Sequence, residues 1–386
     1  MTEKRNKDRN VPTLRFPGFE GEWKEKRIGE LLVIGSGKDY KHLQTGDIPV
    51  FGTGGYMTSV NKYLHDGETV CIGRKGTINK PFYYNGKIWT VDTLFYTHSF
   101  KNLIPRFCFN LFEKINWLHF NEASGVPSLS KSTIENIEVN IPEVSEQKKI
   151  AAFLKKIEER IETQNKIIEE LKLLKSTLCN LLFSQQIKFN LNQGNDSNWK
   201  SLKLEDIFEA LKGNGISKEK LTVTGINKCV LYGELYTKYS EVIEEIASKT
   251  NVSEGTKSKY GDLLIPSSTT TTGIDLANVS AILDNNVMLG GDITILRSKK
   301  EINSMFYAYY LTNYKKKELA SYSQGSTIVH LYFNHFKETI IDFPEKVEQT
   351  KIAKMLFVID NRRNCENEIL VKYESQKKYL LSKLFT

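Results

Sequence analysis

The sequence lacks the features that place a chain in a membrane or an oxidising compartment. No apolar run approaches the ~20 residues of a membrane-spanning helix, and the first ten residues, MTEKRNKDRN, are too polar for a signal peptide. The five cysteines are scattered without a CxxC pair, which argues against a disulfide framework and a cysteine-rich zinc site. These absences predict a cytoplasmic protein with reduced, mostly buried thiols.

Catalytic signatures are missing as well. The six histidines are dispersed and form no HExxH or triad pattern. The stretch GSGKD has Asp39 where a phosphate-binding loop carries a hydroxyl residue, so it predicts a turn, and FGTGG at residues 51–55 predicts a hairpin turn. No Pro-Pro dipeptide occurs, which excludes the Asn-Pro-Pro-Tyr type of motif found in amino-methyltransferases. The sequence therefore predicts no active site.

The chain instead carries an internal repeat. The hexapeptide EQKKIA begins at Glu146 and EQTKIA begins at Glu348, 202 residues later, and Pro142 and Pro344 are separated by the same distance. Further upstream, GEWKEKRIGELL corresponds to SNWKSLKLEDIF, and SGVPSLSKSTIENI corresponds to QGSTIVHLYFNHFKETI. The order of these landmarks predicts the duplication of one unit of about 180 to 200 residues, long enough for a domain followed by a helix.

Each copy of the hexapeptide opens a segment of almost forty residues without glycine or proline, whose apolar residues recur with a heptad rhythm. Such a segment predicts an amphipathic helix roughly 57 Å long. Polar residues interrupt both apolar stripes, Arg160 and Gln164 in the first and Arg362 and Glu366 in the second, and such interruptions favour one register. We expect the two helices to pair with each other, although two unrelated bundles remain an alternative. The candidate pairing residues are Ile150, Ile157, Leu171, Leu178, Ile352, Ile359, Tyr373 and Leu380.

The remainder of each half has the residue pattern of short strands followed by a helix. In the first half, runs of aromatic and β-branched residues alternate with Gly, Asn and Asp, and Asn85-Gly86 predicts a hairpin between FYY and KIWTV. PRFCFNLFEKINWLHF then predicts a helix, and SMFYAYYLTNYKKKELASYS predicts its counterpart in the second half. The pattern is typical of an α+β head on a helical stalk, present twice.

Three stretches of the sequence together resemble a known family. They are LRFPGFEGEWKEKRIGEL, IGRKGTINKPFYYNGKIWTVDTLFY from Ile72 to Tyr96, and P-x-x-x-E-Q-x-K-I-A at both Pro142 and Pro344. They resemble the specificity subunits of type I restriction-modification enzymes over almost the whole chain. The resemblance implies two α+β target-recognition domains at 1–144 and 186–346, each followed by a long spacer helix, at 145–185 and 347–386. It also implies that these helices pair as an antiparallel coiled coil with pseudo-two-fold symmetry.

The resemblance further implies that the chain has a recognition function and no catalytic activity of its own. The chain would read a bipartite, asymmetric target in double-stranded DNA, with one half-site for each domain. Its partners would be two modification subunits, which bind S-adenosylmethionine and methylate adenine, and two ATP- and Mg-dependent restriction subunits, so no cofactor is expected in this chain. A stand-alone nuclease is an alternative, but it needs clustered carboxylates for metal. The other alternative is a coiled-coil scaffold without DNA contact.

The formal net charge of +8 permits nucleic-acid binding without demanding it. In IGRKGTIN, basic side chains lie between glycines that allow close approach, and Arg and Lys suit guanine edges and phosphates. The second half departs from this pattern and has the threonine run of PSSTTTTGID instead, so its contacts do not transfer directly. Polar surface loops remain the alternative in both halves. The candidate DNA-binding residues are Arg74, Lys75, Thr77, Asn79, Lys80, Ser128, Thr269, Thr270, Thr271, Thr272, Ser326 and Thr327.

Overall fold

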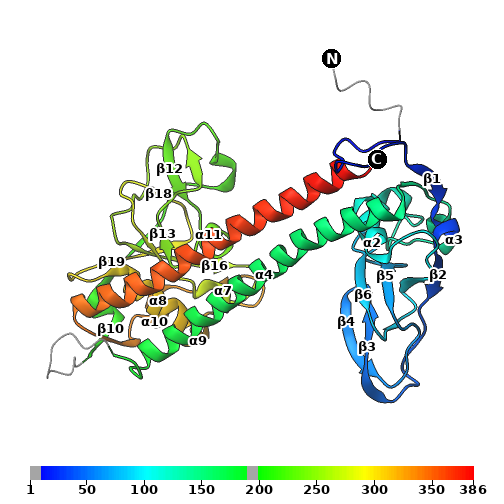
Figure 1. The fold of residues 1–386 in the computed structure, drawn as a ribbon. Helices are drawn as coiled ribbons and strands as arrows, with labels where there is room; N and C mark the ends of the chain where they lie inside the picture. The colour runs from blue at the N-terminus through cyan, green and yellow to red at the C-terminus, as the bar shows by residue number, and fades with distance from the viewer. Residues whose placement is uncertain (1–9, 189–198) are drawn as a thin grey trace. The chain divides into compact units, whose positions relative to one another are not determined.

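The computed structural model describes residues 10–188 and 199–386. They group into two compact units (Figure 1): unit 1 comprises residues up to Asn165 together with Glu368–Thr386, and unit 2 comprises Lys166–Asn367. Residues 1–9, most of the segment that argued against a signal peptide, lie outside the described residues. Among the described residues, no helix combines the length and the apolar composition that crossing a membrane requires.

Unit 1 contains head 1, residues 10–143, which is built from three small sheets. One pairs β1 with β9, a second has the antiparallel order β2-β8-β5-β6, and the third has the order β4-β3-β7, with β3 and β7 parallel. The strands are β1 (Lys24–Arg27), β2 (Val33–Ser36), β3 (Thr45–Gly52), β4 (Gly55–Val60), β5 (Glu68–Gly73), β6 (Phe82–Asn85), β7 (Trp89–Thr90), β8 (Leu94–His98) and β9 (Glu138–Ile141). The helices are α1 (Ile28–Leu31), α2 (Pro105–Lys114), the 3-10 turn η1 (Trp117–Phe120) and α3 (Lys131–Glu135).

Strand pairing in head 1 confirms one predicted turn and overturns another. β3 and β4 form a hairpin whose last pair is Gly52 with Gly55, as FGTGG predicted. The hairpin predicted at Asn85-Gly86 is wrong, because β6 pairs with β5 and the following β7 pairs with β3. A hairpin signal describes the local turn, whereas the partner of a strand is chosen by burial of its side chains in the sheet.

Unit 2 contains head 2, residues 199–345, which has a larger set of sheets. β10 pairs with β21, β16 pairs with β20, and the remaining strands form sheets of order β11-β19-β15-β17-β13 and β14-β12-β18. The strands are β10 (Lys200–Lys203), β11 (Phe208–Lys212), β12 (Asn227–Val230), β13 (Val242–Ile243), β14 (Ser248–Thr250), β15 (Leu263–Pro266), β16 (Ser268–Thr269), β17 (Ser280–Ile282), β18 (Met288–Leu289), β19 (Ile293–Ser298), β20 (Val329–His330) and β21 (Ile340–Phe343). The short helices are α5 (Leu204–Ile207), η2 (Lys218–Lys220), α6 (Glu234–Thr237), α7 (Gly273–Leu276), α8 (Ser304–Tyr309), the π-helical turn η3 (Tyr310–Tyr314), α9 (Lys316–Ser321) and α10 (Phe333–Phe336).

The helix predicted from SMFYAYYLTNYKKKELASYS is confirmed as helical but is divided into α8, η3 and α9. Tyr307, Tyr309 and Tyr310 are fully buried, and Asn313 donates to the Tyr309 carbonyl at 3.0 Å. The segment therefore buries large aromatic side chains in successive turns, and the π-helical turn η3 changes the direction in which these side chains point.

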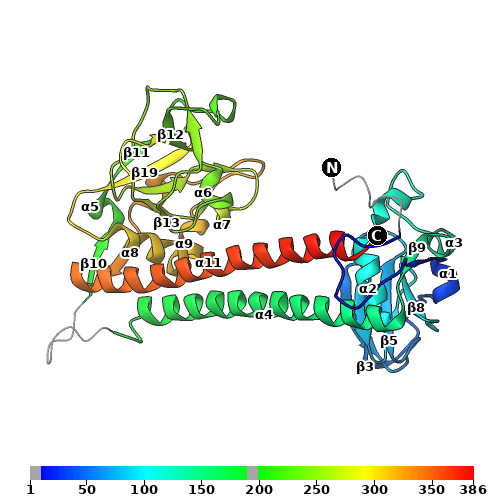
Figure 2. The same cartoon turned by 45° about the horizontal axis from the view of Figure 1, so that its top comes forward.

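The hydrophobic core of each head includes residues of the long helices α4 (Val144–Phe183) and α11 (Lys346–Leu384). These two helices lie side by side in Figure 2. In unit 1 the core contains Ile150 near the start of α4 and Leu384 at the end of α11. In unit 2 the core contains Leu182 near the end of α4 and Ile352 near the start of α11. The start of one helix thus packs with the end of the other in both units, which confirms the predicted α+β heads and antiparallel helices.

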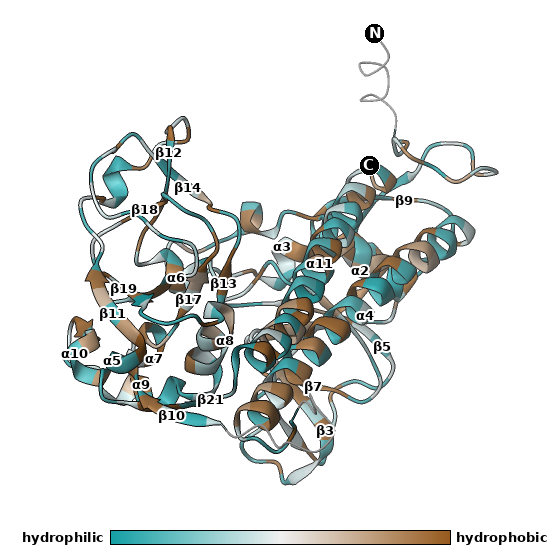
Figure 3. Cartoon of the chain, turned by 90° about the vertical axis from the view of Figure 1, so that its left-hand side faces the viewer, coloured by the Kyte–Doolittle hydropathy of each residue, from teal (hydrophilic) through white to brown (hydrophobic). Residues whose placement is uncertain are grey.

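Figure 3 shows apolar and polar residues alternating along both long helices, as the heptad rhythm predicts. At 40 and 39 residues, each helix is about 60 Å long at ~1.5 Å per residue. Four of the five cysteines are buried and only Cys365 is exposed, which confirms the prediction of mostly buried thiols. Burial raises the pKa of Cys179 to about 12 and that of Cys229 to about 11, so these thiols stay protonated at neutral pH.

Candidate nucleic-acid interface and its helical support

The repeated glutamine, Gln147 or Gln349, joins each long helix to its own head. The Gln147 side chain donates to the carbonyls of Pro142 and Asn102, each at 2.9 Å, and accepts from the Ile104 N–H at 2.9 Å. In the second copy, Gln349 donates to the Pro344 carbonyl and accepts from the Asn303 N–H, both at 2.9 Å. Both amides are buried, so the repeated motif fixes the angle at which the helix leaves the head.

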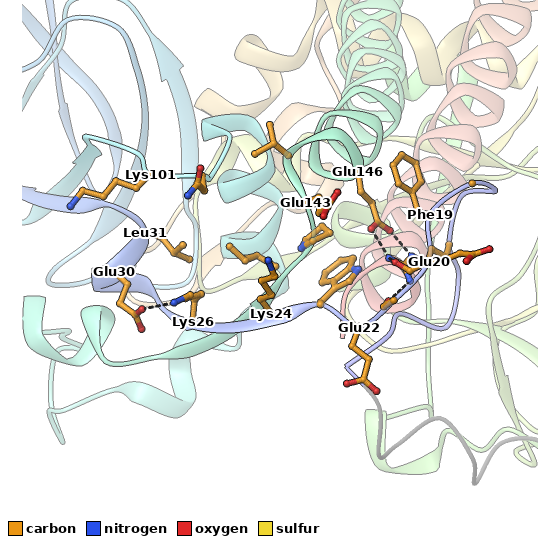
Figure 4. Close-up of a pocket in the computed structure, with 18 residues that line it drawn as sticks. Phe19, Glu20, Glu22, Lys24, Lys26, Glu30, Leu31, Lys101, Glu143 and Glu146 are labelled. Carbon is orange, nitrogen blue, oxygen red and sulfur yellow. Dashed lines mark hydrogen bonds and ion pairs between the residues drawn. The ribbon is translucent and has the colours of Figure 1, made fainter.

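The neighbouring carboxylate in unit 1 is bound by arginine. Arg15 Nε and Nη2 donate to the two oxygens of Glu146, each at 2.8 Å, in a bidentate pair. The side-chain hydrogen bond to Glu146 raises the pKa of Arg15. Both residues line a cavity of about 770 Å³ together with the segment around Phe19 and with Trp23 and Glu143, and Figure 4 shows Glu146 and Phe19 there. Its lining combines the segment from Arg15 to Lys24 with residues around the start of α4.

A second pair of equivalent contacts ties the two long helices together. In unit 2, Lys175 of α4 donates to Asp360 of α11 at 2.8 Å and to Glu241 of head 2 at 2.9 Å. In unit 1, Lys377 of α11 lies 3.1 Å from Glu158 of α4 and 2.6 Å from Glu113 of head 1. Lys377 follows Lys175, and Asp360 follows Glu158, by the same 202 residues that separate the repeated hexapeptides.

These lysine clamps differ in burial. The side chains of Lys175, Glu241 and Asp360 are 5% to 8% exposed, whereas those of Lys377, Glu158 and Glu113 are 15% to 22% exposed. Burial alone would raise the pKa of Glu241, but the Lys175 charge and hydrogen bonds from Lys175 and Asn313 outweigh it and lower that pKa. Each clamp therefore joins one head to both helices through a lysine.

In head 1, the basic loop predicted to contact DNA pairs with the loop before α3. Lys75 and Ser128 form an isolated antiparallel bridge, the Leu129 N–H donates to the Arg74 carbonyl at 2.9 Å, and the Gly76 N–H donates to the Pro127 carbonyl at 2.8 Å. Gly76 has φ +87°, a conformation that favours glycine. The structure thus brings Arg74, Lys75 and Ser128 together, although they come from distant parts of the sequence.

The head 1 candidates differ in exposure. Arg74, Lys75, Asn79 and Lys80 are exposed, and Thr77 and Ser128 are half-buried. The Arg74 guanidinium lies 5.8 Å from the centre of the Phe95 ring and 3.4 Å from the Asp92 carbonyl, which holds its stem against the head. A cation supported in this way loses less side-chain freedom when it binds a phosphate or a base edge.

Head 2 has the same pair of loops in its backbone. β16 pairs with β20, with Ser268 opposite His330, and the Leu331 N–H donates to the Ser267 carbonyl at 3.0 Å. This hydrogen bond corresponds to the one from Leu129 to Arg74, so Ser267 and Ser268 occupy the places of Arg74 and Lys75. Ser267 is buried and its hydroxyl lies 2.7 Å from that of Thr294. Head 2 therefore has no cation at either of these two positions.

The threonine run of head 2 makes hydrogen bonds at the start of helix α7. Thr271 and Thr272 donate to Asp275 Oδ2 at 2.7 and 3.0 Å, and Thr269 is buried with its hydroxyl 2.8 Å from that of Thr271. The hydrogen bond from Thr271 is the main cause that lowers the pKa of Asp275. Thr270 is exposed, as are Ser326 and Thr327 beside Gly325. The structure brings the loops of these residues together, but hydroxyls at 271 and 272 are already bonded to Asp275.

Sequence reasoning missed an aromatic and basic cluster in head 2. The His330 and Tyr332 rings stack at 5.5 Å, His335 meets Tyr332 edge-on at 5.5 Å, and Lys212 lies 5.8 Å from the Tyr332 ring centre. Stacked aromatic rings and cations suit nucleic-acid bases and phosphates. The available signal was the run HLYFNHF at residues 330–336, which stands at the position of Ser128 and its neighbours in head 1.

The candidate helix-pairing residues are all at least half-buried. Ile150, Ile157, Ile352 and Leu380 are buried, and Leu171, Leu178, Ile359 and Tyr373 are half-buried. Of the polar interruptions, Gln164 and Glu366 are buried whereas Arg160 and Arg362 are exposed, and Arg362 pairs with Glu366. Within residues 10–188 and 199–386, no three His, Cys, Asp or Glu side chains are grouped as a metal site.

Comparison with known proteins shows the family. Residues 20–173 and 196–374 match the type I restriction modification DNA specificity domain, once in each half. A Haemophilus influenzae protein provisionally named as a type I restriction enzyme specificity subunit is 25% identical over 395 residues, 94% of each chain. The specificity subunit of the type I restriction enzyme MjaVIII of Methanocaldococcus jannaschii is 24% identical over 285 residues, 69% of this chain and 65% of that one.

The fold has a counterpart among solved structures. The S subunit of a type I restriction-modification system from M. genitalium superposes with a TM-score of 0.67 at 16% identity, covering 97% of this chain and 99% of that one. The duplicated heads and the paired helices are therefore shared with that structure. This chain belongs to the type I restriction-modification DNA specificity domain family, and it is a DNA specificity subunit, a non-catalytic component of such a system.

Proposed function

We propose that this subunit gives its complex a bipartite, asymmetric target in double-stranded DNA, with one half-site for each head. The observation that carries the proposal is the pair of loops that occurs in both heads with the same backbone register and different side chains. The helix starts, by contrast, keep the same glutamine contact to the carbonyl of the preceding proline. Two heads that share the same attachment to the helices but carry different loop side chains are suited to reading two different half-sites.

In head 1, the proposed contacts are Arg74, Lys75, Thr77, Asn79, Lys80 and Ser128. Arg and Lys donate to guanine edges or phosphates, and Asn suits adenine. In head 2, the sequence-derived candidates are Thr269, Thr270, Thr271, Thr272, Ser326 and Thr327. The bonds of Thr271 and Thr272 to Asp275 support a role for them in shaping the loop, and Thr270, Ser326 and Thr327 are the exposed members.

The long helices are proposed to set the spacer between the half-sites. Each extends through both units over about 60 Å, which exceeds the ~34 to 36 Å of one turn of DNA. The division into recognition domains 1–144 and 186–346 and spacer helices 145–185 and 347–386 belongs to the same proposal. The candidate pairing residues from Ile150 to Leu380 would hold the two helices at one separation.

The proposed partners are two modification subunits and two restriction subunits. The modification subunits would bind S-adenosylmethionine and methylate adenine, and the restriction subunits would use ATP and Mg. Because the two helix starts are alike, the same kind of subunit can be bound by each copy. Such a complex would act on DNA in the cytoplasm.

A head exchange tests the division of labour. Residues 201–342 would be replaced by the equivalent head of another type I specificity subunit, and methylated sites would then be mapped by sequencing. We expect one half of the target to change while the other half and the spacer stay the same, because head 1 and both helices are untouched. A change in both half-sites would contradict the proposal.

A matched insertion tests the role of the helices. Seven residues would be added after Asn165 and after Asn367, at the boundary between the two compact units, so that the contacts within each unit are kept. Seven residues lengthen a helix by ~10.5 Å, about three base pairs at ~3.4 Å each. We expect a longer spacer with both half-sites unchanged, and altered base preference at a constant spacer would refute the helix as a ruler.

A further inference from the structure

The ends of β2 and β11 are equivalent positions in the two heads. Ser36 is the last residue of β2, and Lys212 is the last residue of β11. Each is followed by a glycine whose N–H donates to the carbonyl of the first residue of another strand, Gly37 to β8 at 3.2 Å and Gly213 to β19 at 2.9 Å. Lys212 therefore occupies in head 2 the position that Ser36 occupies in head 1.

The paired loops contain a second exchange of this kind. Lys75 pairs with Ser128 in head 1, and Ser268 pairs with His330 in head 2. Residues that lie directly opposite each other in an antiparallel pair have Cβ atoms about 4.5 to 5.5 Å apart. The nitrogen-bearing side chain thus reaches the same cross-strand pair in both heads, but from the other strand in head 2.

The two exchanges are reciprocal. Head 1 carries basic side chains at Arg74 and Lys75 and serines at the positions of Lys212 and His330, whereas head 2 carries serines at the positions of Arg74 and Lys75. Ammonium and imidazole nitrogens form hydrogen bonds with phosphates and base edges. Head 2 therefore keeps such nitrogens beside the loop pair, but on other segments of the chain.

Tyr332 contacts both of these side chains in head 2. Its ring stacks on the His330 imidazole with 5.5 Å between ring centres, its hydroxyl lies 3.1 Å from His330 Nδ1, and Lys212 Nζ lies 5.8 Å from the centre of its ring. Lys212 and Tyr332 are exposed and His330 is half-buried. Within residues 10–188 and 199–386, Lys212 forms no ion pair and His330 Nε2 forms no hydrogen bond, so both nitrogens can bind a ligand.

Tyr332 is an unfavourable residue for its own place in the fold. It stands at the N-cap of α10 and makes no hydrogen bond there with its side chain. Its equivalent Ser130, 202 residues earlier, caps α3 by accepting from the Thr133 N–H at 3.1 Å. Serine is among the most stabilising N-cap residues. An exposed residue that gives up a local stabilising contact indicates a functional position.

We propose that Lys212, His330 and Tyr332 form the DNA contact of head 2. Lys212 binds a phosphate, His330 reads a base edge through Nε2, and Tyr332 positions both side chains with its ring. This inference rests on the function proposed above, and it assigns the contact to residues other than the threonine candidates of head 2.

The variant Lys212→Ser gives head 2 the residue that head 1 has at this position. We expect the assembled complex to lose affinity for all DNA sequences, with a salt slope that decreases by about 0.9 because one phosphate contact is lost. Anisotropy of a labelled target duplex at several salt concentrations measures both. Lys203→Ser is the control, because this exposed lysine of β10 is already paired with Glu338, and it should change neither quantity. An unchanged salt slope in Lys212→Ser would overturn the phosphate contact.

The variant Tyr332→Ser separates function from folding, because it supplies the N-cap residue of head 1. The melting temperature should stay the same or rise, whereas affinity for the target should fall at least about fivefold, the lower end for a base contact. Tyr332→Phe keeps the ring and should bind more tightly than Tyr332→Ser. Mapping of methylated sites should show relaxed preference in the half-site that the exchange of residues 201–342 alters.

Unchanged affinity and preference in Tyr332→Ser, or relaxed preference in the other half-site, would overturn the proposal. These failures are distinct from a failure of the function proposed above. If the exchange of residues 201–342 alters one half-site while Lys212→Ser and Tyr332→Ser have no effect, only the assignment of these residues is wrong. If that exchange alters both half-sites, the division into one half-site for each head is wrong.

Discussion

The two halves of this molecule differ in the loops proposed to contact DNA, and they agree in the glutamine contacts that join each head to its long helix. Ser267 and Ser268 replace Arg74 and Lys75 at equivalent backbone positions, while Gln147 and Gln349 make the same contacts at the two helix starts. A helix start must satisfy fixed backbone groups, which leaves little freedom of side chain. The loop positions are exposed at Arg74 and Lys75 in head 1 and buried at Ser267 and Ser268 in head 2, so the two heads differ there in burial as well as in side-chain chemistry.

The lysine clamps extend the comparison into the supports. Lys175 and Lys377 have equivalent partners, but the clamp of unit 2 is more deeply buried and also includes Tyr309, which donates to Asp360 at 2.8 Å. In unit 1, Arg106 also pairs with Glu158, and in unit 2 Arg363 also pairs with Asp360, so each of these two carboxylates has a second cation. Equivalent clamps therefore differ in burial, and four experiments test how far the two halves differ in stability and in DNA contact.

The largest effect is expected for Lys175→Met. The change leaves Glu241 and Asp360 buried beside each other without the lysine, which should cost about 3 to 5 kcal/mol in the free energy of unfolding. Lys377→Met should cost clearly less, because Glu113 and Glu158 are more exposed than Glu241 and Asp360, while each clamp keeps its second cation, Arg106 or Arg363. Denaturant unfolding measures both, with Lys172→Met, at an exposed lysine of α4, as the control. Equal costs for the two clamps would show that burial does not separate them.

Arg74→Ala is expected to weaken DNA binding by the assembled complex by about 1 to 3 kcal/mol if Arg74 reads a base edge, and to relax one position of one half-site. If Arg74 holds only a phosphate, affinity should fall for all sequences and the salt slope should decrease by about 0.9. Ser267→Ala is the matched variant in head 2, where the side chain is buried and no change in affinity is expected. Unchanged affinity, preference and salt slope in Arg74→Ala would remove this loop from the interface.

The buried carboxylates at the helix starts should respond in opposite directions. Glu146→Gln weakens a charge-assisted pair and should lower the free energy of unfolding by about 1.5 kcal/mol, at the lower end because the Arg15 side chain is 15% exposed. Glu348→Gln removes a buried charge without a described partner and should not lower it. Thermal unfolding of both variants decides the matter, and a loss of stability in Glu348→Gln alone would contradict the asymmetry.

The smallest effect is a pH dependence of the unit 2 clamp. The folded-state pKa of Glu241 is lowered from its ordinary value of 4.5, so its contribution to stability is present above that value and is lost as the pH falls through the folded-state pKa. The difference in stability between the wild type and Glu241→Gln should therefore shrink as the pH falls below about 4. Denaturant unfolding between about pH 3 and 7 measures it, and a difference that stays constant or grows towards low pH would rule out this linkage.

Much of the architecture could be predicted from local signals. The helices starting at the two hexapeptides followed from an unbroken heptad rhythm, and their pairing followed from the need of two long apolar stripes for a partner. The hairpin at Asn85-Gly86 failed because β6 and β7 each found a better partner elsewhere in head 1. Turn chemistry acts over a few residues, whereas strand pairing is decided across the whole sheet.

The duplication, the two amphipathic helices and the basic character of the Arg74 loop could be read from the sequence alone, because a repeat, a heptad rhythm and a run of charges are patterns of residue order that need no knowledge of contacts. Only the tertiary structure decided that Leu129 meets Arg74 as Leu331 meets Ser267, and that Lys175 lies between Glu241 and Asp360. The structure likewise gathered Lys212 with Tyr332 and left Glu348 buried without a described cation. These contacts join residues far apart in sequence, and their free energy depends on burial and distance, which no local pattern records.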